Sequence, residues 1–431
     1  MSIPGAMGKN TINNQKKKLA KLRKKNAAKL NIESLTVEDL LKQAQEQIDS
    51  FQYEKAQTLC QEALKRDPDN VSALETSASL CLEVGNLDGA KHCLGRAITL
   101  KPEDGYSKYM SMAQLLEDKA SLQCYQKGIE LLTKVISGLQ QSVKENKKEC
   151  SKNSSSDVSI KEAETSTEEG ESPNDDKKTS VIGATGCKSD PFPSCLSVDP
   201  EGRISTLVRQ LSTAHCSVAE LFMTDLCDED DAENQCSTSI TTAIQVDPSN
   251  PEAYQHMASF LLVKQEVQEA KTYITKSIEI WLPKYKEVDE GKAAAGTFDP
   301  VEVCPLSYAT RLSAARILIE VEDYKHAVDV LEGLTEENDE IVDTWYLLGW
   351  THYLQGGEQA NSARYYLRRA LKVHAAAPCD DEQLVEHLKE LLQELGPETE
   401  EETVNDVEIE DVIDRDLSDE EVPEPEEMDT N

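Results

Sequence analysis

The stretch VEDLLKQAQEQIDSFQYEKAQTLCQEALKRDPDN, residues 37–70, is followed directly by VSALETSASLCLEVGNLDGAKHCLGRAITLKPED, residues 71–104. The two stretches align without a gap at a spacing of 34 residues. Small residues recur where two helices of a hairpin cross closely, and a proline after the second helix ends it. The matched positions hold Leu40, Ala44, Ala56, Ala63 and Pro68 in the first stretch, and Leu74, Ala78, Ala90, Ala97 and Pro102 in the second.

A 34-residue period of this kind is typical of the tetratricopeptide repeat, a helical hairpin that stacks into a solenoid. A degenerate unit follows at 105–138, and the register then returns in four later units. The sequence therefore predicts an all-α tetratricopeptide-repeat solenoid of about seven interrupted repeats, capped by an amphipathic helix at Glu382–Leu395. The later units hold, at equivalent positions, Cys236, Ile240, Ala243 and Pro248; Met257, Ala258, Ala270 and Ile274; Ala315, Ala327 and Leu331; and Trp345, Leu348, Gly349, Tyr353, Ala363, Leu367 and Ala370.

Composition divides the chain further. A segment rich in Ser, Glu and Lys is typical of disorder, and a second stretch lacks helical periodicity. The expected organisation is a basic disordered arm at 1–34, repeats one to three at 35–138, a disordered insert at 139–204, repeats four and five at 205–283, a loop at 284–306, repeats six and seven with the cap at 307–396, and an acidic disordered tail at 397–431.

The charge is strongly uneven. The whole chain carries a net −36, and the tail holds seventeen acids against a single Arg415. An acidic body repels nucleic acid and attracts basic partners, so we expect no direct nucleic-acid binding. No apolar run is long enough for a membrane helix and no secretory signal is evident, so we expect a cytoplasmic and nuclear protein.

Motifs that carry chemistry are missing from the sequence. The seven histidines form no metal-ligand spacing, the twelve cysteines form no C-x-x-C pair, and no phosphate-binding glycine loop occurs. We therefore expect no metal, no cofactor and no catalytic residues. The sequence favours a binding protein over an enzyme.

In a tetratricopeptide stack the first helix of each hairpin lines a concave groove. Most charged residues at the predicted groove positions are acids, with Arg316 as an exception. Acids beside aromatic rings suit an extended Lys/Arg-rich peptide, through charge steering and cation–π contacts. We assign Trp345 to the core instead. The predicted groove residues are Glu38, Glu75, Tyr106, Tyr109, Asp225, Asp228, Glu252, Asp343, Tyr346 and Trp350, with Tyr353 beside them.

Co-chaperones that clamp a terminal carboxylate need Lys, Arg and Asn in the groove. The corresponding positions here offer a carboxylate no positive partner, which disfavours that class. They hold Leu41, Gln45, Ser79, Tyr109 and Ala113.

Two less generic stretches carry a resemblance to a known family. They are YMSMAQLLEDKASLQCYQKGIELL at residues 109–132 and the segment 219–281, which begins AELFMTDLCDEDDAENQC. In these the chain resembles the dedicated assembly chaperones of ribosomal protein L-four, a large-subunit protein with a long basic internal loop. The resemblance implies that the acidic groove shields this loop of the newly made protein until ribosome assembly. The alternative is a generic scaffold or co-chaperone adaptor for another basic client.

The two termini leave alternatives open. The basic cluster in the arm is either a nuclear import signal, read by an import receptor, or the first turns of a helix fraying from the stack. The acidic tail is an inert solubiliser, a second contact for a basic client, or an intramolecular partner of the arm. The basic cluster consists of Lys16, Lys17, Lys18, Arg23, Lys24 and Lys25.

Overall fold

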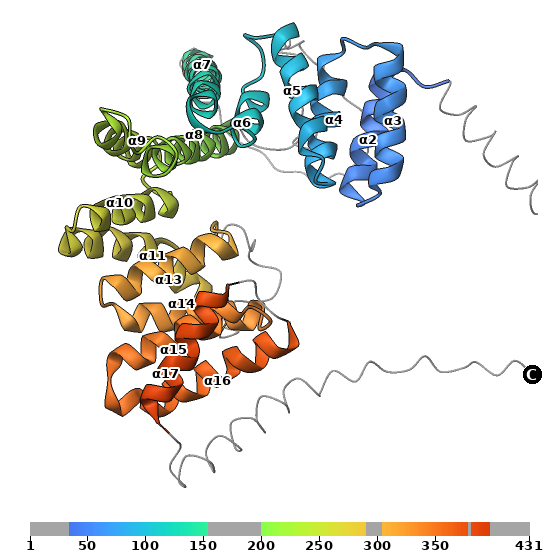
Figure 1. Cartoon of the computed structure of the whole chain (residues 1–431). Helices are drawn as coiled ribbons and strands as arrows, with labels where there is room; N and C mark the ends of the chain where they lie inside the picture. Colours follow the sequence, from blue (N-terminus) through green and yellow to red (C-terminus); the bar gives the residue numbers. More distant parts are fainter. Residues whose placement is uncertain (1–33, 154–199, 290–303, 378–380, 397–431) are drawn as a thin grey trace, which may run out of the picture. The chain divides into compact units, whose positions relative to one another are not determined.

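The computed structural model describes residues 34–153, 200–289, 304–377 and 381–396 (Figure 1). Within these ranges the protein consists of α-helices and one short 3-10 helix, with no strand. The chain divides into two structural units, one ending at Glu233 and the other beginning at Asn234. The basic cluster of the arm and the acidic tail lie outside the described residues.

Seven consecutive helix pairs and a final helix make up the described chain, which confirms the predicted repeat fold. Six of the pairs lie within one unit, and α8 and α9 span the boundary. The first unit holds α2 (Val37–Asp49), α3 (Tyr53–Arg66), α4 (Val71–Glu83), α5 (Leu87–Leu100), α6 (Ser107–Ala113), α7 (Asp118–Asn153) and α8 (Pro200–Met223). The second holds most of α9 (Ala232–Val246), then α10 (Pro251–Val263), α11 (Val267–Asp289), α13 (Tyr308–Glu320), α14 (Tyr324–Glu337), α15 (Val342–Gln355), η1 (Gly357–Gln359), α16 (Ala360–Ala376) and α17 (Glu382–Leu395).

The helices begin at side chains that satisfy their free backbone donors. Thr36 and Asp39 form a reciprocal capping box at α2. Asn70 Oδ1 accepts from the Ala73 backbone N–H at 3.0 Å and so begins α4. Such caps stabilise a helix by about 1 kcal/mol each. They place the helix starts in the register that the 34-residue repeat predicts.

Five of the described turns inside hairpins contain a left-handed backbone residue. Phe51 has φ 55°, and Gly85, one repeat later, has φ 72°. Gln265, Glu322 and Gly356 occupy the corresponding turns of later hairpins, with φ 63°, 57° and 92°. Glycine adopts this conformation at little cost, whereas the other side chains are disfavoured there. The tight turn is therefore part of the repeat.

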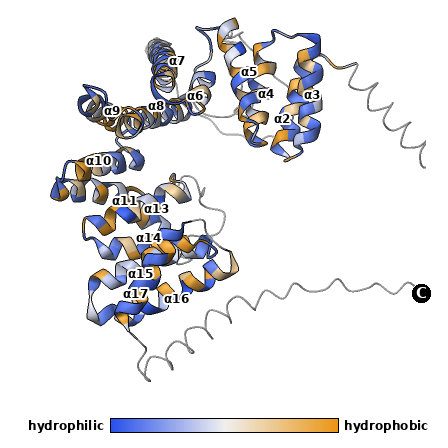
Figure 2. Cartoon of the chain, viewed as in Figure 1, coloured by the Kyte–Doolittle hydropathy of each residue, from blue (hydrophilic) through white to orange (hydrophobic). Residues whose placement is uncertain are grey.

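Small residues occupy the hairpin crossings, as predicted. Ala44, Ala56 and Ala63 are fully buried in the first hairpin, and Ala363 and Ala370 in the last. A Cβ atom added at Gly349 would lie 2.6 Å from Leu367 Cγ, so glycine permits the close approach of α15 and α16. Apolar and polar residues alternate along the helices, as expected for elements with one buried face (Figure 2). Trp345 lies in the core at 7% exposure, which confirms its assignment.

The predicted insert, 139–204, is too wide at both ends. Helix α7 continues to Asn153, and α8 begins at Pro200. Gln141 Nε2 donates to Glu145 Oε1 at 3.1 Å within this extension, and proline is well accommodated in the first turn of a helix. Residues 154–199 lie outside the described part of the chain.

The predicted loop, 284–306, also begins later than expected. Helix α11 passes through Pro283 and ends at Asp289. The Tyr285 hydroxyl donates to the Gly333 carbonyl at 3.2 Å, and Lys286 Nζ lies 2.6 Å from Asp329 Oδ2. These contacts with α14 offset the backbone hydrogen bond that proline removes.

Candidate functional site

The predicted groove residues of the first hairpins occupy different environments. Glu38 is exposed in the first turn of α2. Glu75 on α4 is half-buried, and burial raises the pKa of its carboxyl while the nearby Lys108 opposes that shift. Lys108 is itself buried and donates to the carbonyls of Lys101, at 2.6 Å, and Asp104. Glu75 is thus held within the fold and is only partly available to a ligand.

Two predicted groove tyrosines of the third hairpin also differ in how far they are exposed. The Tyr106 hydroxyl donates to Gln210 Oε1 on α8 at 2.8 Å, which leaves the ring half-buried. Tyr109 is 7% exposed, and its hydroxyl donates to the Pro102 carbonyl at 2.9 Å. The prediction that Tyr109 lies in an open groove is wrong, because its ring fills the junction between α5 and α6.

Asp225 and Asp228 do not lie on a first helix. Helix α8 ends at Met223, so both residues follow it in the turn before α9, where both are exposed. Buried Leu226 fixes this turn. The predicted placement on a groove-lining helix is wrong, because α8 ends at Met223 and both residues lie beyond it.

The two predicted acids on α10 and α15 differ in their neighbours. Glu252 lies half-buried in the first turn of α10, close to His256. Arg316 Nη2 on α13 lies 2.6 Å from Asp343 Oδ1 on α15. This ion pair neutralises much of the charge that the sequence assigned to this face.

Three aromatic residues on one face of α15 form what we call the aromatic row: Tyr346, Trp350 and Tyr353. The rings of Trp350 and Tyr353 stack with centroids 5.5 Å apart and planes 12° apart. The sequence analysis assigned all three to one groove-lining helix. It did not predict what covers them.

Helix α17 contacts the aromatic row at three points. The Tyr346 hydroxyl and His387 Nδ1 lie 2.8 Å apart, and the His387 ring meets Trp350 edge-on at 4.9 Å. The Tyr353 hydroxyl donates to Glu394 Oε2 at 2.5 Å. The predicted capping helix therefore forms part of this surface.

Four exposed glutamates follow one another at four-residue spacing along α17, and we call them the glutamate row: Glu382, Glu386, Glu390 and Glu394. Like charges at this spacing disfavour a helix, so packing must hold α17 in place. Leu388 is fully buried and Leu391 is 3% exposed on the opposite side. Sequence reasoning missed this row, although the four-residue spacing is visible in Glu382–Leu395.

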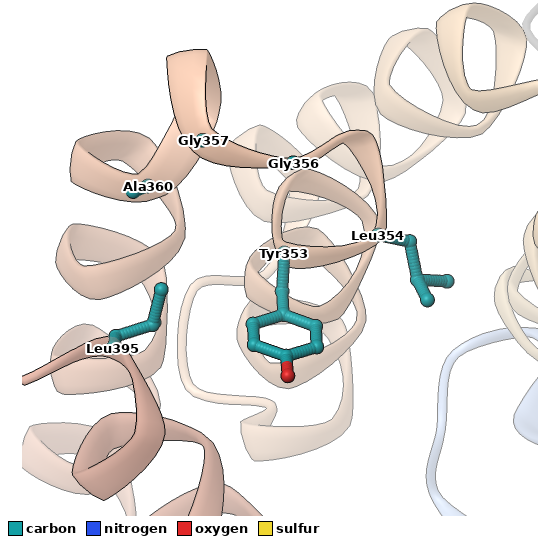
Figure 3. Close-up of a pocket in the computed structure, with 6 residues that line it drawn as sticks. All are labelled: Tyr353, Leu354, Gly356, Gly357, Ala360 and Leu395. Atoms are coloured by element: carbon teal, nitrogen blue, oxygen red, sulfur yellow. The ribbon is translucent and has the colours of Figure 1, made fainter.

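A cavity of about 380 Å³ lies at the end of the aromatic row (Figure 3). It is lined by Tyr353 and Leu354 of α15, the Gly356–Gly357 turn, Ala360 of α16 and Leu395 of α17. The glycine pair between the last two repeat helices thus lines a space at the junction of three helices.

The metal-ligating side chains of the described residues do not cluster. No group of three or more His, Cys, Asp or Glu in the described ranges could hold a metal ion. The cysteines described are free, and burial raises the pKa of Cys60 and of Cys236 to about 11. No helix in this part of the chain is long and apolar enough to cross a membrane.

Comparison with family models identifies the repeats. Two models described as tetratricopeptide repeat match residues 47–115 and 312–379. A solved structure named Assembly Chaperone of RpL4 (Acl4) superposes with a TM-score of 0.56 at 23% identity, over 76% of this chain and 100% of that one. At this identity the likeness establishes the fold alone.

Two curated fungal proteins, each named "Probable assembly chaperone of rpl4", are similar in sequence. The Schizosaccharomyces pombe protein is 36% identical over 210 residues, 46% of this chain and 59% of that protein. The Emericella nidulans protein is 30% identical over 204 residues, 42% of this chain and 50% of that protein. The alignments thus span between half and three-fifths of these relatives.

Neither relative is named as an enzyme, in agreement with the prediction of a binding protein. The repeats, their register and these relationships lead to one assignment. The described chain has the tetratricopeptide-repeat fold, and over less than half of its length it is similar in sequence to two fungal proteins named as probable assembly chaperones of rpl4.

Proposed function

We propose that this protein is an assembly chaperone of ribosomal protein L-four, and that it shields a basic segment of that client before ribosome assembly. The observation that carries the proposal is the glutamate row of α17 lying beside the aromatic row of α15 through the Tyr353–Glu394 contact. The homology to the two fungal chaperones supports the identity of the client.

The two rows together suit an extended cationic chain. The aromatic rings offer faces for Lys and Arg side chains, while exposed carboxylates offer ion pairs that water and salt screen. The four glutamates span twelve residues of helix, about 18 Å at 1.5 Å per residue. An extended peptide covers this length with about five or six residues. Such contacts are individually weak, which allows ribosomal RNA to take over the client.

The glutamate row replaces part of the originally predicted groove. Asp343 is paired with Arg316, and Glu75 is half-buried within the electrostatic reach of Lys108, so reversing either charge would disturb the fold as well as any binding. Glu386 and Glu390 are exposed side chains on a helix that packs through its other face. They are therefore the sharper positions for a test. Glu38, Tyr106, Asp225, Asp228 and Glu252 stay in the proposal as secondary contacts.

The test begins with affinity purification of the full chain from cells, followed by mass spectrometry of the proteins recovered. Ribosomal protein L-four should be recovered in a stoichiometric amount. A set of partners without any basic ribosomal protein would instead support a generic scaffold or adaptor and contradict the proposal.

The site is tested with purified ribosomal protein L-four and the double variant Glu386→Lys/Glu390→Lys. Two reversed charges should weaken binding about tenfold, equivalent to about 1.4 kcal/mol, and should reduce the dependence of the dissociation constant on salt. The matched control is Glu279→Lys, which reverses an exposed glutamate on α11. If the control weakens client binding equally, or if the double variant binds the client with unchanged affinity, α17 is not part of the binding site.

We also propose that the basic cluster at residues 16–25 acts as a nuclear import signal read by an import receptor. Its composition of Lys and Arg supports this role. A fluorescent full-length fusion should enter the nucleus, and replacing the six basic residues with Ser should retain it in the cytoplasm. Unchanged nuclear entry of the substituted protein would argue against the signal.

A further inference from the structure

The cavity at the end of the aromatic row has apolar walls that the proposed ion pairs do not use. Its side chains come from three helices: Tyr353 and Leu354 of α15, Ala360 of α16 and Leu395 of α17 (Figure 3). Leu354 is 38% exposed and Leu395 is half-buried, so both still offer apolar surface to a ligand. Covering such surface would stabilise a complex.

The turn between α15 and α16 leaves one side of this cavity without side chains. A Cβ atom added at Gly356 or at Gly357 would meet no other atom within 4 Å. Gly356 has φ 92°, a conformation that favours glycine. The glycine pair thus forms a wall of bare backbone, over which an entering group can pass.

The lining favours an apolar occupant over a polar metabolite. The Tyr353 hydroxyl is the one polar side-chain group among the lining residues, and it already donates to Glu394 Oε2 at 2.5 Å. Sites for small molecules have volumes of about 300–1,000 Å³ and several polar groups that fix the ligand. With about 380 Å³ and one committed hydroxyl, this cavity suits a single aliphatic or aromatic side chain.

Acidic side chains flank the cavity on two sides. Glu394, the last member of the glutamate row, accepts the hydrogen bond from the wall residue Tyr353. Glu358 follows the glycine pair directly in η1. Both glutamates are exposed. An apolar pocket between carboxylates complements a chain in which an apolar residue stands next to Lys or Arg.

We propose that this cavity holds one apolar side chain of the client, next to the cationic residues that the glutamate row binds. The inference rests on the proposed function and specifies the segment that the site selects. The glutamate row runs from Glu394, beside the cavity, to Glu382, so the apolar residue stands at one end of the Lys/Arg-rich stretch. Its burial distinguishes the client from other basic chains, which charge alone does not.

Fluorescence anisotropy with the full chain and two labelled peptides tests the proposal. Both peptides contain six Lys and Arg residues, and one carries leucine at each end where the other carries alanine, which serves either chain direction. The leucine peptide should bind about fivefold more tightly, since leucine buries more apolar surface than alanine. Added salt should weaken both peptides and leave their ratio unchanged, because salt screens the ion pairs and not the apolar contact.

Two variants alter the cavity in different ways. Ala360→Phe fills it from α16, and Leu354→Ser removes apolar surface from its most exposed wall residue. Each should reduce the advantage of the leucine peptide to less than about twofold and leave the affinity for the alanine peptide unchanged. The matched control is Val263→Ser, which removes an exposed apolar side chain at the end of α10 and should leave both affinities unchanged.

Equal binding of the two peptides to the unaltered protein would overturn the cavity assignment alone. So would a leucine advantage that both cavity variants leave intact. Glu386→Lys/Glu390→Lys should weaken both peptides and keep their ratio. Failure of both peptides to bind the unaltered protein would count against the cationic site on α17 as well, so the two proposals fail in distinguishable ways. Self-association of the full chain that Ala360→Phe abolishes would assign the cavity to a second copy of this chain instead.

Discussion

The Tyr353 hydroxyl on α15 donates a 2.5 Å hydrogen bond to the Glu394 carboxylate on α17. This contact joins the last repeat helix to the helix that closes the stack. Together with the Tyr346–His387 contact, it packs α17 against the aromatic row of α15. Helix α17 therefore packs into the core through its leucines, and its polar face forms part of the candidate site.

Leu388→Ala should detach α17 from the fold. Leu388 is fully buried, and removing such a side chain costs about 2–5 kcal/mol. Hydrogen exchange measured by mass spectrometry should show faster exchange throughout residues 382–395 and unchanged exchange in α2–α5. The control is Lys389→Ala, which shortens the exposed neighbour of Leu388. Equal exchange in the two variants would show that α17 is not held by this packing.

Two glycine substitutions should change stability in opposite directions. Gly349→Ala places a Cβ 2.6 Å from Leu367 Cγ and 3.0 Å from the Leu367 backbone nitrogen, so it should destabilise the second unit by about 1–3 kcal/mol. Gly138→Ala meets nothing within 4 Å on an exposed face of α7, so it should stabilise that helix by about 0.5–1 kcal/mol.

Urea unfolding, followed by tryptophan fluorescence, measures the effect of Gly349→Ala, since all three tryptophans lie in the second unit. Hydrogen exchange of α7 measures the effect of Gly138→Ala on the stability of that helix. The same sign for both variants would contradict the contacts described at these glycines.

Stability should fall on mild acidification. Burial lowers the pKa of His215, His256 and His352, with Glu252 opposing the shift at His256. The unfolded chain takes up protons near the ordinary value of about 6.5, while the folded chain resists them. The stabilisation is thus fully present above about pH 6.5 and is lost as pH falls below it.

Melting temperatures measured between pH 8 and pH 5 test this dependence. His352 stacks on Tyr366 with ring centroids 5.2 Å apart, so His352→Phe keeps a ring in place and removes one titrating group. The pH dependence of the second unit should become shallower in this variant. An equally steep fall would show that His352 does not contribute.

Lys108→Met should destabilise the third hairpin by roughly 1–3 kcal/mol, because the Lys101 and Asp104 carbonyls lose their donor. Glu75 would also remain half-buried without its cationic neighbour. Hydrogen exchange of residues 101–113 measures the loss. Adding Glu75→Gln should recover part of it, and strict additivity of the two changes would show that the two residues are not coupled.

The repeat register and the core could be predicted because burial within a hairpin is a local pattern. Ala44, Ala56 and Ala63 recur one period later, and the same spacing placed Trp345 in the core. The continuation of α11 beyond Pro283 could not be predicted, because it depends on Tyr285 and Lys286 contacting α14, about 45 residues further along the chain. The end of α8 at Met223, which leaves Asp225 and Asp228 in the following turn, was not predicted either.

The sequence by itself determined the hairpin fold, the aromatic row and the acidic character of the chain, since periodicity and composition express each of these directly. Only the tertiary structure decided which surfaces those residues form. Arg316 pairs with Asp343, Lys108 lies close enough to Glu75 to oppose the shift of its pKa, and α17 brings Glu394 to Tyr353 of the aromatic row. The net charge at a site is the sum of the charges of neighbouring side chains from several helices. The sequence of one helix does not show which residues those neighbours are.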